Sequence, residues 1–122
     1  MQITTFNPSI VTSHAADAVA LFEELGFTQA HNKTGIDGDV ASYDLKYGED
    51  FRVDIAQLDS QSQDMTVIRM NVRDFDEAYD FLVSKGFKNA SGDKVIDTGS
   101  SKAALMISPS GFGIGLAEHI RK

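Results

Sequence analysis

The chain has 122 residues, enough for one domain that buries most of the surface its unfolded chain exposes. It contains no cysteine, which excludes disulfide bonds, thiolate nucleophiles and zinc–thiolate sites, and allows a reducing compartment. The formal net charge of -7 argues against nonspecific nucleic-acid binding, which needs clustered Lys and Arg. Solubility is one reason for such a charge, and a site for a cationic ligand is another.

The N-terminus lacks a basic region followed by an apolar core, so no signal peptide is predicted. No apolar run approaches the length of a membrane helix. We therefore expect a soluble, cytoplasmic protein with neither a membrane nor a nucleic acid as its partner.

The first half of the chain reads as a strand, a helix and three further strands. A strand is predicted at 3–11, and Ser13 or His14 can begin the helix that follows. Gly26 ends this helix, because only glycine enters the left-handed conformation there without steric cost. The later strands are predicted at 28–32, 40–46 and 51–57, joined by polar, glycine-bearing turns at 34–38 and 47–50. One apolar stripe on a 3.6-residue period marks the helix: Ala15, Ala18, Val19 and Phe22.

The second half repeats this order after a polar linker at 59–64. A strand at 65–72 leads into a helix that Asp74 can cap, with Glu77 completing a capping-box pattern and Gly86 ending the helix. Strands are predicted at 94–98, 102–107 and 113–117, with turns at 99–101 and 108–111. The apolar stripe of this helix consists of Phe75, Ala78, Tyr79 and Leu82.

The two helical segments, HAADAVALFEELGF and DFDEAYDFLVSKGF, align at an offset of 60 residues. Their Gly-Phe pairs coincide, and their apolar stripes match position by position. This pattern predicts a duplication in a single α+β domain, with module one at 1–58 and module two at 65–122. Each module has the order βαβββ, with largely antiparallel pairing and a helix that covers its own sheet.

The phrases ALFEELGF, NVRDFDEAYDFLVSKGF and ISPSGFGIGL, in this arrangement, resemble the vicinal oxygen chelate superfamily of glyoxalase, bleomycin-resistance and ring-cleaving dioxygenase proteins. The resemblance implies two tandem βαβββ modules that form an open barrel around a shared cavity, within one chain or across a dimer. We expect a homodimer. Metal-dependent members of the superfamily line the cavity with His, Gln or Glu from the first and last strand of each module.

The resemblance also assigns the metal-ligand positions in this sequence. The first-strand position falls on Asn7 and Val67, and the last-strand position falls on Gly115 in module two. In module one it falls on Arg52 or Asp54, depending on how the 47–50 turn is counted. Valine and glycine have no ligating side chain, so at most two donors remain where a divalent ion needs about three. We therefore expect no cofactor, with Asp54 as a weak metal candidate.

The three histidines add no metal or catalytic set. His14 lies at the first helix start, where a surface or capping role is expected. His31 lies in a predicted strand, and His119 lies near the C-terminus. No HExxH motif, no Ser-His-Asp order and no phosphate-binding glycine loop is present.

Polar side chains on the first strands are the candidates for ligand binding. Alternation along a strand places Asn7 and Ser9 on the cavity side of module one, and Arg69 on that side of module two. Asp54 can pair with Arg69 or Arg52, either to fill a cavity floor or to anchor a polar ligand group. Apolar walls are expected from Tyr43, Phe51, Met106 and Phe112. The candidate set is Asn7, Ser9, Tyr43, Arg52, Asp54, Arg69 and Met106.

Two classes of function fit these residues. The first is a metal-free protein, similar to the bleomycin-resistance branch, that holds a small aromatic or cationic compound between its modules. The second is a lyase, isomerase or dioxygenase whose divalent metal is held partly by Asp54. A regulatory or sensor module without chemistry is a third possibility. The sequence identifies neither a catalytic residue nor the ligand.

Overall fold

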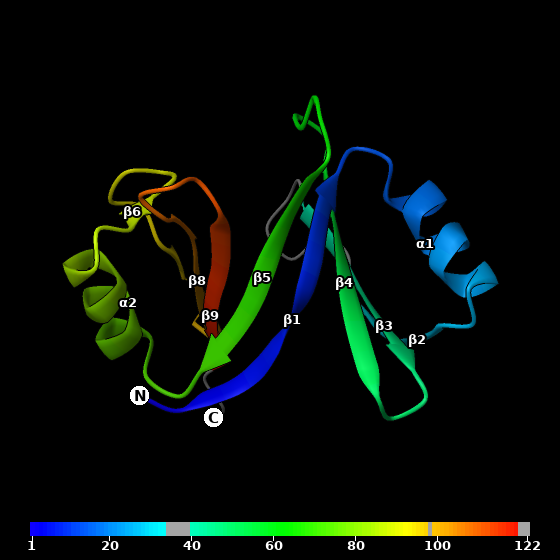
Figure 1. The fold of residues 1–122 in the computed structure, drawn as a ribbon, viewed down its shortest axis with the longest axis horizontal. Helices are drawn as coiled ribbons and strands as arrows, with labels where there is room; N and C mark the ends of the chain where they lie inside the picture. Colours follow the sequence, from blue (N-terminus) through cyan, green and yellow to red (C-terminus); the bar gives the residue numbers. More distant parts are fainter. Residues whose placement is uncertain (34–39, 98, 120–122) are drawn as a thin grey trace. The chain divides into compact units, whose positions relative to one another are not determined.

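The computed structural model describes residues 1–33, 40–97 and 99–119 (Figure 1). The chain forms two compact units. The first, Asn7–Thr66, is called the module-one unit, and the second, Met1–Phe6 with Val67–Lys122, is called the module-two unit. Each unit is described separately.

The module-one unit contains one helix and a mixed sheet. Its strands lie in the order β2-β3-β4-β1, with β1 parallel to β4 and the other neighbours antiparallel. The helix packs on one face of this sheet. The buried core between them consists of Ala15 and Val19 from the helix and Leu45, Val53 and Ile55 from the strands. The elements are β1 (Ile3–Thr12), α1 (Ala15–Glu24), β2 (Thr28–Lys33), β3 (Val40–Tyr47) and β4 (Phe51–Leu58).

The module-two unit has the same plan. Its strands lie in the order β5-β9-β8-β6, with β5 parallel to β9, and β7 also pairs with β8. The elements are β5 (Met65–Val72), α2 (Phe75–Ser84), β6 (Lys88–Asn89), β7 (Ile96–Asp97), β8 (Ser101–Ile107) and β9 (Gly113–His119). Between α2 and the sheet lies a core of Met70, Val72, Phe75, Ala78, Leu82, Ala104, Met106, Ile114 and Leu116.

The predicted helix signals are confirmed at both ends of α2. The Asp74 carboxylate accepts a hydrogen bond from the backbone N–H of Glu77 at 3.1 Å. Gly86 has a φ of +96°, and Gly26, which follows α1, has a φ of +112°. His14 occupies the N-cap position of α1, but its side chain makes no capping hydrogen bond. His14 is exposed, so of the surface and capping roles expected for it the surface role is confirmed and side-chain capping is not.

The α+β class and the βαβββ order of both modules are confirmed, and both predicted apolar stripes lie in the cores. The short strand β6 was not predicted, because two polar residues carry no alternation signal. The predicted turn at 34–38 lies outside the described residues. Both described helices are ten residues long, and neither is long and apolar enough to cross a membrane.

Candidate functional site

The pairing of β1 with β4 fixes the register that the sequence left open. Ser9 lies beside Asp54 in this parallel pair, and Arg69 lies beside Gly115 in the equivalent pair of β5 with β9. Ser9 and Arg69 are equivalent at the offset of 60 residues. The module-one counterpart of Gly115 is therefore Asp54 and not Arg52.

Asp54 projects from the sheet face opposite α1. Its neighbours Val53 and Ile55 are buried in the α1 core, and side chains alternate along a strand. Asn7 reaches the same face, since its side-chain amide donates a hydrogen bond to the Asp54 carboxylate. We call this side of the module-one sheet the polar face. Its polar members on β1, β3 and β4 are Asn7, Ser9, Ser42, Asp44, Lys46, Arg52 and Asp54.

The centre of the polar face is buried. Asn7 is 9% exposed, Ser9 is 8% exposed and Asp54 is 6% exposed. The Asn7 Nδ2 atom donates to Asp54 Oδ2 and lies 3.2 Å from the carbonyl oxygen of Pro8. A buried carboxylate is costly unless it is hydrogen-bonded, and the Asn7 amide offsets part of this cost. The contact also holds the carboxylate in one position.

A second carboxylate lies beside Asp54. Asp44 on β3 is directly opposite Asp54 in the antiparallel ladder and is partly buried. Like charges placed directly opposite one another are destabilising by themselves, and both aspartates have further interaction partners within the protein. Sequence reasoning missed Asp44. The available signal was the alternation of Tyr43 and Leu45 with Asp44, which places the aspartate on the polar face.

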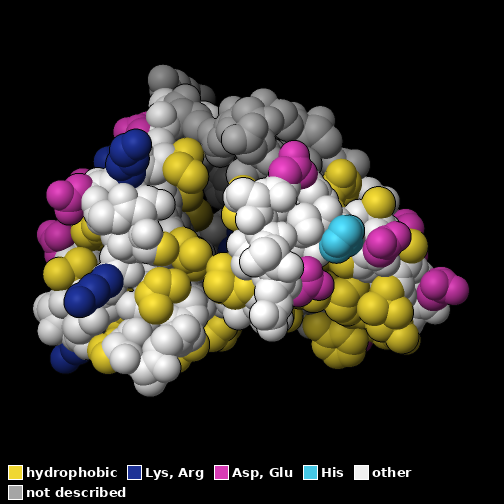
Figure 2. Space-filling model, turned by 90° about the horizontal axis from the view of Figure 1, so that it is seen from above, with side chains coloured by type: hydrophobic (Ala, Val, Ile, Leu, Met, Phe, Trp, Pro, Cys, Tyr) yellow, Lys and Arg dark blue, Asp and Glu magenta, His cyan; other side chains and the backbone are white. Residues whose placement is uncertain are grey.

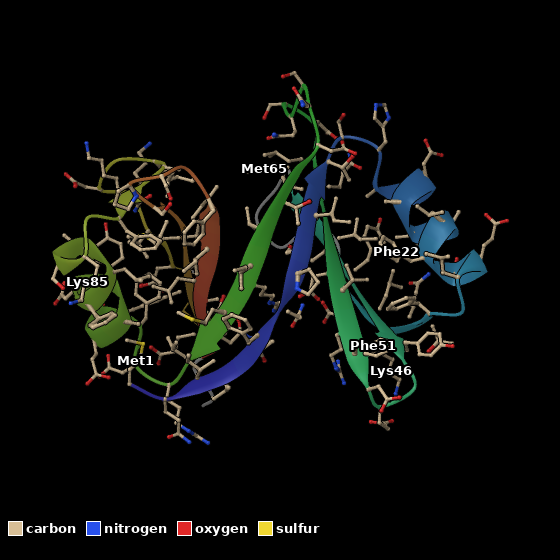
Figure 3. All side chains as sticks on the ribbon, viewed as in Figure 1. Met1, Phe22, Lys46, Phe51, Met65 and Lys85 are labelled. Carbon is tan, nitrogen blue, oxygen red and sulfur yellow. The ribbon has the colours of Figure 1, made fainter. Side chains whose placement is uncertain are left out.

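The polar face changes its charge toward the β3–β4 hairpin. Lys46 and Arg52 are paired across the two strands, one step beyond the two aspartates. Arg52 is exposed, and the Lys46 ammonium lies 3.6 Å from Glu49. Figure 3 shows Lys46 at this end of the sheet. Asp44 and Asp54 thus lie at the buried centre of the polar face, and Lys46 and Arg52 lie nearer the hairpin, where Glu49 pairs with Lys46.

The corresponding face of the module-two unit carries Arg69 on β5, beside Gly115 on β9. The Arg69 Nε atom donates to Asn71 Oδ1 at 3.4 Å, and Asn71 is 7% exposed. At Gly113 an added Cβ would lie 2.8 Å from Val67 Cγ1, so any larger residue would have to displace the Val67 side chain. At Gly115 the nearest atom would be 3.9 Å away. Neither Val67 nor Gly115 has a side-chain donor atom, so the two positions that the resemblance assigns in this unit offer no metal ligand.

Two of the candidate ligand contacts lie elsewhere. Met106 is fully buried in the core beneath α2, and Tyr43 is partly buried against the core beneath α1. Both side chains face a helix and do not share a face with Asn7 or Arg69. Phe51 and Phe112 are 58% and 51% exposed, respectively.

The described residues do not fit the metal shell that the superfamily resemblance implies. No group of three or more His, Cys, Asp or Glu side chains able to hold a metal occurs among them. The module-one unit offers oxygen atoms from Asn7, Asp44 and Asp54. Oxygen donors suit hard cations such as Mg²⁺ or Mn²⁺ rather than Zn²⁺.

Neither a protein-family model nor a curated protein sequence matches this chain. The crystal structure of a selenomethionine methylmalonyl-CoA epimerase is similar, with a TM-score of 0.70 and 14% identity over 99% of both chains. Methylmalonyl-CoA epimerase from Mycobacterium tuberculosis has a TM-score of 0.71 and 15% identity over 98% of this chain and 91% of that one.

A glyoxalase/bleomycin resistance protein/dioxygenase superfamily member from Vibrio splendidus 12B01 is also similar. Its TM-score is 0.60, with 12% identity over 93% of this chain and 97% of that one. The chain therefore has the fold of the glyoxalase/bleomycin resistance/dioxygenase superfamily. At these identities the likeness is one of fold.

Proposed function

We propose that this protein binds a small cationic compound, without a metal, over the polar face of the module-one unit. One observation carries the proposal: the buried Asp54 carboxylate is fixed by Asn7 on the sheet face that α1 does not cover. Pockets for small molecules commonly combine apolar surface with a few fixed polar groups of this kind.

Stability alone gives a poor reason for this arrangement. The apolar core of the unit lies on the other side of the sheet, between the strands and α1. Taking a carboxylate out of water costs free energy, so a buried charged group is weak evidence for a role in stability alone. Asp54 and Asp44 bring two carboxylates to this face, and this negative charge supports a cationic ligand.

The polar face favours a cationic ligand over an aromatic one. No aromatic side chain lies on this face in the described parts of β1, β3 and β4 of the unit. Tyr43 packs on the opposite side, against the α1 core. Asp44 and Asp54 attract positive charge, and the net charge of -7 adds long-range attraction.

A second candidate is a lyase, isomerase or dioxygenase that uses a divalent metal. Two features support it: the resemblance assigns a last-strand ligand position that corresponds to Asp54 in this register, and Asn7 donates a hydrogen bond to the Asp54 carboxylate. An ion bound there would take its oxygen ligands from Asn7, Asp44 and Asp54. Two of the similar structures are epimerases, which are isomerases, and this likeness in fold supports an isomerase as one form of the second candidate.

Thermal unfolding separates the two candidates. Chelator-treated protein is heated with a panel of small amines and quaternary ammonium compounds, or with Mg²⁺, Mn²⁺, Ni²⁺, Zn²⁺ or Fe²⁺. A ligand at about a hundred times its Kd adds about 2.7 kcal/mol, a shift of several degrees for a domain of this size. Asp80→Asn on the exposed surface of α2 is the control for Asp54→Asn, because both remove one carboxylate.

The proposal expects a cationic compound to stabilise the wild type and Asp80→Asn but not Asp54→Asn. Equal stabilisation of all three proteins would contradict it, as would a panel in which no cation acts. Stabilisation by a metal alone, lost in Asp54→Asn, would replace it with the second candidate.

A further inference from the structure

The polar face of the module-one unit carries charges of both signs, in two adjacent levels of the β3–β4 ladder. Asp44 lies directly opposite Asp54, and Lys46 lies directly opposite Arg52, two residues nearer the hairpin. Residues two apart on a strand point to the same face. The level of the aspartates and the level of the basic residues are therefore about 7 Å apart along the strands.

Basic side chains are scarce in this half of the chain. Among residues 1–58, Lys33, Lys46 and Arg52 are the only Lys and Arg residues, and acidic residues outnumber them. Figure 2 shows several acidic side chains over α1. Lys46 and Arg52 nevertheless occupy facing positions on the polar face, next to the two aspartates. The paired charges are thus a feature of this face and do not reflect the charge of the module as a whole.

The two levels also differ in exposure. Asp54 is 6% exposed and Asp44 is partly buried, whereas Arg52 is exposed. A ligand that spans both levels would have its positive end enclosed by protein and its negative end in contact with water. Removing a charge from water is costly, so the enclosed end needs the opposite charge that the aspartates supply. The exposed end keeps part of its hydration and needs less from the protein.

The basic side chains are not committed to the two aspartates. The Lys46 ammonium lies 3.6 Å from the Glu49 carboxylate. Arg52 forms no ion pair with any residue that the structure describes. Asp44 and Asp54 have partners of their own within the protein, but one carboxylate has about four acceptor sites and can receive a further donor. Both levels can therefore take part in binding a ligand.

From this arrangement we infer that the compound bound on the polar face is a zwitterion, with an ammonium group at Asp44 and Asp54 and a carboxylate at Arg52. The inference rests on the proposed function and specifies its ligand class. The planar guanidinium of an arginine can hold a carboxylate through two parallel hydrogen bonds. Glu49 and Asp50, in the adjoining turn, disfavour a doubly charged phosphate there.

The spacing of the levels limits the shape of the zwitterion. Because they are about 7 Å apart, the ammonium and the carboxylate belong at opposite ends of a short chain and not on neighbouring atoms. An ω-amino carboxylate such as δ-aminovalerate meets this condition. Its amide, δ-aminovaleramide, and pentylamine keep the ammonium group and the chain length but lack the negative charge.

Calorimetric titration with these three compounds tests the inference. We expect δ-aminovalerate to bind the wild type about tenfold or more tightly than the other two, because its carboxylate makes a charge-assisted contact with Arg52. In Arg52→Gln this advantage should disappear, while the affinity for pentylamine stays the same. Arg73→Gln, at an exposed arginine of the module-two unit, is the matched control and should keep the advantage. Unfolding temperatures confirm that both variants are folded.

Equal affinity of the wild type for δ-aminovalerate and pentylamine would overturn the inference and leave the proposed cationic ligand in place. An advantage that persists in Arg52→Gln would overturn it too, because Arg52 would not hold the carboxylate. Tighter binding of aminobutylphosphonate than of δ-aminovalerate would contradict the choice of a carboxylate. Failure of all these compounds to bind would contradict the proposed function together with the inference.

Discussion

The Glu118 side chain on β9 accepts a hydrogen bond from the backbone N–H of Phe75, the first residue of α2, at 2.7 Å. Module one repeats this contact with an amide, because Gln57 on β4 accepts from the N–H of Ala15, the first residue of α1, at 2.8 Å. The first N–H groups of a helix have no partner within the helix. In both modules the last strand therefore supplies a partner for the start of the helix.

Glu118→Ala should lower the free energy of unfolding by about 1–2 kcal/mol, because the Phe75 N–H loses its acceptor and α2 loses a favourable negative charge. Urea unfolding measures the change. Glu118→Gln is the matched control, since module one uses glutamine in the same role. An alanine variant as stable as the wild type would show that the contact adds nothing.

Gly86→Ala should destabilise the module-two unit for two reasons. Gly86 has a φ of +96°, and an added Cβ would lie 2.8 Å from Pro109 Cγ. Gly92, with a φ of +76° and no atom within 4 Å of such a Cβ, separates the two causes. We expect a loss of about 1 kcal/mol for Gly92→Ala and a larger one for Gly86→Ala, read from chemical unfolding. Equal losses would show that Pro109 moves aside.

Met106→Ala tests the position of this side chain in the core. The residue has no exposed surface, so the loss of its contacts should cost about 2–5 kcal/mol of stability. Phe112→Ala, at a half-exposed ring, should cost less. The affinity for a cationic ligand should be unchanged in Met106→Ala, provided that the protein is folded at the temperature of the assay. A loss of ligand affinity in Met106→Ala, with the protein still folded, would show that Met106 contributes to the binding site.

Removing the Asn7 amide should weaken the folded state through Asp54. In Asn7→Ala the buried carboxylate loses a hydrogen bond, which typically costs about 1–3 kcal/mol. Ser13→Ala, at a partly buried position between β1 and α1, serves as a comparison. A double-mutant cycle with Asp54→Ala should give a coupling energy of at least about 0.5 kcal/mol. Additive effects would contradict a direct contact.

The helices and their faces followed from the sequence because local signals determine them. The stripe of Phe75, Ala78 and Leu82 needed only the helical period, and the cap at Asp74 needed only its spacing from Glu77. The partner of the Phe75 N–H could not be found in this way. Glu118 is 43 residues away, and only the closed sheet brings it to the helix.

The polar face was only partly predictable. Alternation from the first strand placed Asn7 and Ser9 on one side, but Asp54 and Arg52 were separated only by the pairing of Ser9 with Asp54. Tyr43 and Met106 were assigned to a ligand wall by residue type. Their facing depends on the register of neighbouring strands, which no local pattern encodes.

The measurement that tests the central claim most directly is an NMR titration with the cationic compound that stabilises the protein most. The side-chain amide of Asn7 reports on the site, because it donates to the Asp54 carboxylate. The account predicts that the Asn7 amide and the backbone signals of β4 shift together and saturate, and that Asp54→Asn abolishes the response. Shifts confined to other elements, with the Asn7 amide unchanged, would contradict it.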